Sequence, residues 1–312
     1  MDIVTLTASI ISSLGISVLA VTWLAKELIK HRLGKDLEYN RTALKQDLEK
    51  QKSEWQGQIK KEVEEYLGEK AAEREYILDA KKRLYSVIGP LRFQLLIACR
   101  DMVGRLTTHS EKNFQMELSH YYGKSMIYRI LKPLSISQLI ENQISYADFS
   151  IDPSAIALLQ FKRAAFSAFT GRRPIIQHSK ANWNEQTEHI FYDNLNRASN
   201  ALLFERNETV TEIIQYQEFE EQLKNSEFYN QLYPLTEIIN DFDLKKQPVF
   251  WLRLVCYGYI CNEFIKKVGK DIGFEIKNYR VAEMIELCND SEIISHLNQY
   301  ESVFHEVSMM KL

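Results

Sequence analysis

The chain begins with an unbroken run of uncharged residues. Twenty-three consecutive residues, from Ile3 to Ala25, carry no charge. At about 1.5 Å per helical residue, such a run would cross a hydrocarbon layer of ~30 Å. The pattern therefore predicts a single transmembrane helix in residues 1–25. The alternatives are an interfacial or buried helix and a cleaved signal peptide, but a signal peptide requires basic residues before its apolar run, and only Met1 and Asp2 precede it here.

Basic residues follow the uncharged run instead of preceding it. They are Lys26, Lys30, Arg32 and Lys35. Segments on the cytoplasmic side of a membrane helix are enriched in Lys and Arg. The sequence therefore predicts a single-pass protein of a bacterial inner (plasma) membrane, with the N-terminus outside and the C-terminal part in the cytoplasm.

Small hydroxyl residues recur every four positions within the uncharged run. This spacing places them on one face of a helix. Small residues on a membrane helix allow two backbones to approach closely, and their hydroxyls can bond across the interface. The alternative is that each hydroxyl bonds to its own helix. We take the first interpretation as a predicted surface for oligomerisation within the bilayer, formed by Thr5, Ser9, Ser13 and Ser17.

Residues 26–85 form a highly charged segment with few apolar positions. Between Lys35 and Arg83 there are 12 basic and 12 acidic residues and no proline. An 11-residue repeat keeps an apolar stripe on one side of a nearly straight helix. The segment is predicted to be a helical stalk that pairs as a coiled coil; a single solvated helix is the alternative. The repeat has two rows, Leu33, Leu44, Trp55, Tyr66 and Ile77, and Leu37, Leu48 and Ile59.

Residues 86–312 have the broader amphipathic pattern of a helical domain. No stretch shows the sustained alternation that is typical of a half-buried strand. The fold class is therefore predicted to be all-α, with a helical bundle after the stalk. The strongly apolar run from Val249 to Ile265 is interrupted by Arg253, which favours a central core helix. The predicted helices are Arg83–Leu106, Phe114–Ser145, Ser154–Phe169, Trp183–Phe204, Val210–Phe242, Val249–Val268, Val281–Leu287 and Ser291–Met309.

Composition supports a helical protein and gives little sign of catalysis. The 312 residues include only 11 glycines and 6 prolines, which disfavours turn-rich β architectures. The net charge of −3 gives no overall basic character of the kind found in nucleic-acid binders. The four cysteines lack a CxxC spacing, and no HExxH motif is present, so no metal site or cofactor is predicted. Gly123-Lys124-Ser125 lacks the glycine-rich loop that a phosphate site requires.

One short motif resembles an active site. In the segment GRRPIIQH, four residues separate Arg173 from His178. This spacing resembles the motif of the helical HEPN ribonucleases. The resemblance implies that arginine and histidine residues from two protomers act together on an RNA phosphodiester. A histidine can transfer the proton, and a guanidinium can stabilise the charged phosphate. Pro174 departs from the family pattern, in which a polar residue usually follows the arginine. Catalysis by Arg173 and His178 is therefore an alternative to a purely structural loop.

The same region is also a candidate binding surface. Basic residues alternate here with the aromatic residues Phe166, Phe169 and Trp183. Such a combination can bind anionic lipid head groups or single-stranded nucleic acid. The alternative is a solvated connector whose aromatic side chains enter the core. The basic residues are Lys162, Arg163, Arg172, Arg173 and Lys180.

The functional expectation is a protein that acts by interaction and not by catalysis. A membrane anchor, an extended stalk and a helical domain without an active-site constellation are the parts of a sensor, a scaffold or a membrane effector. The layout is similar to that of some bacterial phage-defence and signalling proteins, an analogy of architecture alone. We expect a homo-oligomer, with a protein partner through the stalk or helical domain. A membrane-tethered ribonuclease and a lipid- or nucleic-acid-binding module are the alternatives.

Overall fold

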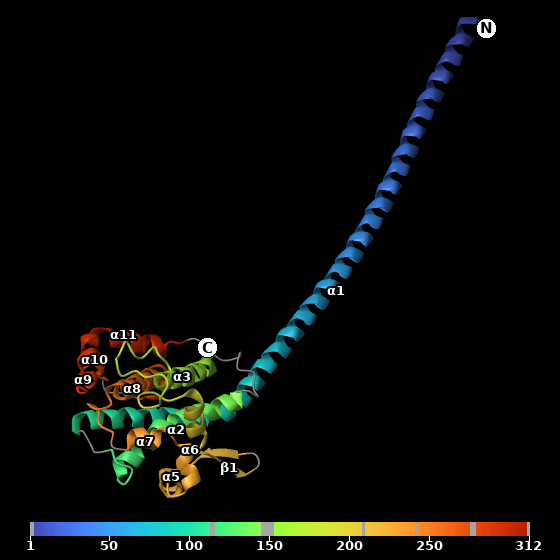
Figure 1. Cartoon of the computed structure of the whole chain (residues 1–312). Coiled ribbons are helices and arrows are strands. Elements are labelled where there is room, and N and C mark those ends of the chain that lie inside the picture. Colours follow the sequence, from blue (N-terminus) through green and yellow to red (C-terminus); the bar gives the residue numbers. More distant parts are fainter. Residues whose placement is uncertain are drawn as a thin grey trace. The chain divides into compact units, whose positions relative to one another are not determined.

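The computed structural model is predominantly helical, as the sequence predicts (Figure 1). It describes residues 3–112, 116–144, 153–207, 210–240, 242–274 and 279–310, without the side chains of residues 3–17, 19, 87, 153, 154, 206, 207, 210 and 271. The elements are α1 (Ile3–Lys112), α2 (Tyr121–Ile144), α3 (Pro153–Thr170), α4 (Tyr192–Asn200), β1 (Leu203–Asn207), β2 (Val210–Ile213), α5 (Tyr216–Gln222), α6 (Ser226–Gln231), α7 (Leu235–Ile239), α8 (Pro248–Gly269), η2 (Lys270–Ile272), α9 (Val281–Glu286), α10 (Ser291–Ser295) and α11 (Leu297–Ser308).

The chain divides into two compact units. The first comprises Met1–Glu75 and the second Tyr76–Leu312. We call them the arm and the head. Helix α1 supplies the whole arm and the first part of the head, and it continues through Pro90, although proline lacks the N–H that a helix interior requires. The stalk was predicted to end at residue 85, later in the same helix.

The transmembrane helix predicted in residues 1–25 is contradicted. Among the residues that the structure describes, no helix contains a stretch long and apolar enough to cross a bilayer. The predicted inner-membrane location, with its outside N-terminus and cytoplasmic domain, is corrected by the same finding. The side chains of the predicted membrane oligomerisation surface lie outside those described: Thr5, Ser9, Ser13 and Ser17.

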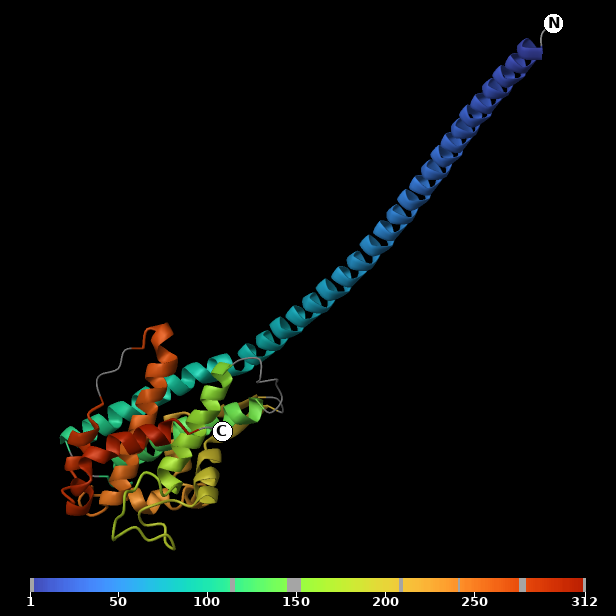
Figure 2. The same cartoon turned by 90° about the horizontal axis from the view of Figure 1, so that it is seen from above.

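Helix α8 is the buried centre of the head. It packs against α3, α9 and α11 (Figures 1 and 2). The sequence predicted this helix, and Pro248 occupies its first turn, where a missing N–H costs nothing. Its large polar side chains have partners: Trp251 Nε1 donates to the carbonyl of Met284 (2.7 Å), and the Tyr257 hydroxyl donates to the carbonyl of Ile130 (3.0 Å). The helix is therefore fixed by directional bonds as well as by apolar burial.

A two-stranded hairpin departs from the predicted all-α fold. Strands β1 and β2 pair antiparallel, with Leu203 opposite Ile213 and Phe204 opposite Glu212. The helix predicted from Trp183 to Phe204 overlaps the start of β1, and the helix predicted from Val210 to Phe242 covers all of β2. Valine, threonine and isoleucine are β-branched and fit a pleated strand better than a helix. Among the described residues, this hairpin is the only sheet.

His109 makes the stability of the head depend on pH. Its ring is fully buried beside Phe242 and Trp251, with centroids 6.1 and 5.7 Å away. Burial, together with the charge of Arg105 and against that of Asp243, lowers its pKa to about 4. An unfolded histidine titrates near 6.5, so the unfolded chain binds an additional proton between these values.

The free energy of unfolding is therefore expected to decrease as the pH falls from 6.5 to 4, by about 3 kcal/mol. Urea unfolding at several pH values in this window measures it. In His109→Phe, that part of the pH dependence should disappear. An identical dependence in both proteins would contradict the assignment.

Candidate functional site

The loop that carries the predicted catalytic and basic residues connects α3 to α4. It is held in place by Arg253 of α8, whose side chain is 1% exposed. Arg253 Nε donates to the carbonyl of Glu188 (2.8 Å), and Nη1 donates to the carbonyls of Ala168 and Gly171 (both 2.9 Å). Burial lowers the pKa of Arg253 to about 10, against the attraction of Cys256 and Glu188, so it stays charged at neutral pH. One buried guanidinium therefore joins both ends of the loop to the core helix.

Glu188 and Trp183 complete this anchor. A Glu188 carboxylate oxygen accepts the backbone N–H of Phe250 (2.9 Å) in the first turn of α8. Burial raises the pKa of Glu188. Two cations lie close to the Trp183 ring, with Arg172 5.0 Å and Arg253 5.5 Å from its centroid. The aromatic and acidic residues of the loop therefore serve its attachment to α8.

His178 connects the loop to the start of α10. Its Nδ1 accepts the backbone N–H of Lys180 (3.1 Å), so Nε2 carries the hydrogen and donates to Asp290 Oδ1 (3.1 Å). The same Asp290 oxygen accepts the N–H groups of Glu292 (3.0 Å) and Ile293 (3.2 Å), which caps α10. Both ring nitrogens of His178 are thus engaged in structural bonds.

Removal of the Asp290 carboxylate should destabilise the head. Asp290→Ala eliminates the helix cap and leaves the buried Nε2–H of His178 without its acceptor. We expect a loss of about 2 kcal/mol in the free energy of unfolding, measured with urea at pH 7. Glu301→Ala, at an exposed position on α11, is the matched control and should change little. If both variants unfold alike, the cap and the histidine link have no energetic importance.

The predicted Arg173–His178 pair has no distinct catalytic arrangement. Arg173 is exposed, whereas the His178 side chain is 1% exposed and bonded as described above. A general acid or base needs a ring nitrogen within reach of its substrate. The HEPN-like ribonuclease therefore remains a prediction that no described contact favours.

The predicted basic surface divides into two parts. Lys162 is buried, forms an ion pair with Glu141 and lies 5.4 Å from the centroid of Phe166. It borders a groove of about 390 Å³ together with exposed Arg163. Arg172 lies instead against Trp183, while Arg173 and Lys180 are exposed elsewhere on the loop. The structure thus brings Lys162 together with Arg163 only, and an acidic partner neutralises the first.

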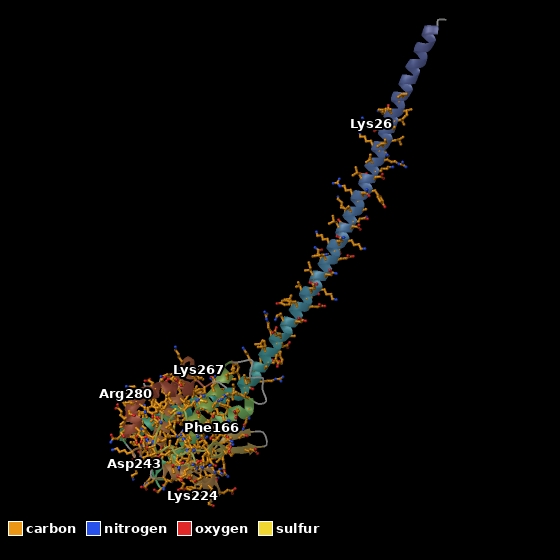
Figure 3. All side chains as sticks on the ribbon, turned by 45° about the horizontal axis from the view of Figure 1, so that its top comes forward. Lys26, Phe166, Lys224, Asp243, Lys267 and Arg280 are labelled. Atoms are coloured by element: carbon orange, nitrogen blue, oxygen red, sulfur yellow. The ribbon has the colours of Figure 1, made fainter. Side chains whose placement is uncertain are left out.

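The arm presents the predicted apolar stripe to solvent. Side chains project outward along the arm (Figure 3). Leu44, Leu48 and Trp55 are 66%, 60% and 68% exposed. Leu48 and Trp55 also border a shallow apolar surface together with Lys52. Large apolar side chains in a continuous exposed row are typical of a surface that a partner covers.

The residues beside the stripe carry opposite charges on its two sides. In an 11-residue repeat, the positions three and eight residues after the first row fall on opposite flanks. The acidic flank contains Asp36, Asp47 and Glu69, with Gln58 in the same row. The basic flank contains Arg41, Lys52 and Arg74, with Val63 in the same row. The division between the two flanks follows from the 11-residue spacing alone, although the prediction from the sequence was limited to the stripe.

In the described part of the chain, few residues are placed to support metal or thiol chemistry. There, no group of three or more His, Cys, Asp or Glu side chains could hold a metal ion. The four cysteines, Cys99, Cys256, Cys261 and Cys288, are buried free thiols. Burial raises the pKa of Cys256, which disfavours the reactive thiolate.

Comparison with known proteins assigns the chain to no family. Neither a known protein family, nor a curated protein, nor a solved structure matches it.

Proposed function

We propose that the protein acts by interaction, as a scaffold or sensor whose arm pairs with the arm of a second copy. The pair is parallel and in register. The observation that carries this proposal is the 11-residue repeat of exposed apolar side chains along the arm. The head then forms the part of each subunit that is free to bind other molecules.

The period of the stripe favours a second copy as the partner. A partner helix must follow the same 11-residue period to remain in contact from Leu33 to Tyr66. An identical arm does so at every repeat. Burial of leucine and tryptophan side chains that are otherwise more than half exposed supplies the driving force, at about 25 cal/mol for each Å² removed from water.

The charged flanks favour the parallel orientation. In a parallel two-stranded coil, the flank on one side of a helix faces the opposite flank of its partner. Arg41, Lys52 and Arg74 of one arm would therefore face the acidic flank of the other. An antiparallel pair would bring like flanks together, which is unfavourable.

The molecular mass of the full-length protein tests the proposal. Size-exclusion chromatography with light scattering should give twice the chain mass of 36.6 kDa at micromolar concentration. The dimer should dissociate on dilution and not in 0.5 M salt alone, because apolar contacts supply most of the affinity. A mass of one chain at every concentration would refute self-association.

A further inference from the structure

Three basic side chains converge in the head where α1 and α2 pack together. Arg105 Nη2 and Arg129 Nε both donate to the hydroxyl oxygen of Ser125, at 2.8 and 3.1 Å. Lys132 lies one turn beyond Arg129, with its Nζ 5.4 Å from the centroid of Tyr128. Burial and the neighbouring charge of Arg129 lower the pKa of Arg105, and burial lowers that of Lys132. The three cations are therefore held close together at an electrostatic cost.

No ion pair compensates this cluster within the described part of the chain. Arg105 is 8% exposed, and neither it nor Arg129 nor Lys132 forms an ion pair there. Asp101 lies nearby and attracts Lys132, but its carboxylate forms its ion pair with Arg100, at 2.9 Å. Buried charges in proteins are normally paired. An anion from outside the chain would supply such a partner.

A cavity of about 260 Å³ opens beside the cluster. Arg129, Lys132, Ser125 and Tyr216 line it, together with Asp101. Two polar groups at this place are buried without a hydrogen-bond partner: the hydroxyl of Tyr216, in the cavity wall, and Nε of Arg105, behind Ser125. Guanidinium and ammonium groups bind phosphate oxygens strongly, and a tyrosine hydroxyl can donate to the same group. The chemistry of the cavity therefore fits a phosphate monoester.

A second cavity adjoins the first and extends the site. Its volume is about 390 Å³, and it shares Lys132 and Gln215 with the first cavity. Its other walls include the apolar side chains of Ile97, Leu139 and Ile213. Gln94 and Thr211 add groups that can bond to a polar ring edge. The second cavity thus offers a mixed apolar and polar space next to the phosphate-binding end.

We propose that these two cavities form a nucleotide-binding site, which takes a nucleoside monophosphate with its phosphate on Arg129 and Lys132 and its base in the second cavity. This site belongs to the head and does not depend on pairing of the arms. It would give the protein a small-molecule ligand to sense.

Calorimetric titration of the full-length protein with AMP, GMP, CMP and UMP tests the proposal. At least one of the four should bind once per chain, and its nucleoside should not bind. Lys132→Gln should weaken that binding about tenfold or more, because a charge-assisted phosphate contact is lost. Lys267→Gln, at an exposed basic position elsewhere on the head, should bind like wild type (Figure 3).

A second variant keeps the test decisive if Lys132→Gln does not fold. Tyr216→Phe preserves the ring and removes only the unpartnered hydroxyl, and should weaken binding about threefold or more. The absence of binding by all four nucleotides would overturn the proposal. The proposal would also be overturned if the folded variants bound the nucleotide with unchanged affinity, or if inorganic phosphate bound as tightly as the best nucleotide.

Discussion

A chain with both Leu44→Asp and Leu48→Asp is expected to remain monomeric. Each leucine is worth about 1.5–3 kcal/mol when buried against a partner helix, and each occurs in both arms. The substitution also introduces four carboxylates at the contact, which would have to lose their hydration without an ion-pair partner. Light scattering should therefore give a mass of 36.6 kDa at concentrations at which wild type has twice that mass.

Ser53→Asp is the matched control for this variant. Ser53 lies on the side of the arm opposite the stripe, nine residues after Leu44, and is exposed. The Ser53→Asp substitution adds an acidic residue to the same helix outside the proposed contact, so the dimer should persist. Circular dichroism should show equal helix content in both variants. A dimer that survives the double substitution would contradict pairing through the stripe.

Replacement of Arg253 by leucine is expected to cost the head about 3–5 kcal/mol of stability. The substitution leaves three backbone carbonyls, those of Ala168, Gly171 and Glu188, without their donor. Each unsatisfied buried acceptor costs about 1–3 kcal/mol, which exceeds the gain from an additional apolar side chain. It also removes a positive charge close to the buried carboxylate of Glu188.

Urea unfolding at pH 7 measures this effect. Arg163→Leu is the control, because Arg163 is exposed on α3 and its replacement should change the free energy of unfolding little. The loop between α3 and α4 should also become more susceptible to protease in Arg253→Leu than in the control. If Arg253→Leu were as stable as wild type, Arg253 would not be the anchor of that loop.

Local sequence patterns were sufficient to predict those features whose contacts are local or periodic. The apolar run from Val249 to Ile265 predicted α8, and the structure confirms a helix from Pro248 to Gly269. The spacing of Leu33, Leu44 and Trp55 likewise predicted a stripe on one side of the arm, and these side chains are exposed in α1. Both features depend on residues within a few turns of one another.

Features built from distant residues could not be predicted in this way. The helix predicted from Trp183 to Phe204 begins only at Tyr192, because Trp183 and Glu188 are held by α8, more than 60 positions later. His178 looked like a catalytic residue because its partner, Asp290, is 112 positions away. A short motif in the sequence cannot show that both ring nitrogens are already occupied.

The cation cluster of the head illustrates the same limit. Arg105 and Arg129 lie on different helices, and Ser125 joins them. In the sequence, neither arginine belongs to a basic run, whereas Arg172 and Arg173 do. Adjacent charges drew attention to the loop, but the close approach of separate cations arises from the packing of α1 against α2.

Disulfide cross-linking between arms tests parallel self-association most directly. The native cysteines are buried, so wild type provides the blank. In a parallel, in-register pair, residue 44 of one arm faces residue 44 of the other, at a separation that a disulfide can span. Oxidation of Leu44→Cys should give a covalent dimer, and Ser53→Cys, on the opposite side, should give none. If Leu44→Cys remained a single chain, or if both variants cross-linked equally, parallel pairing of the arms would be contradicted.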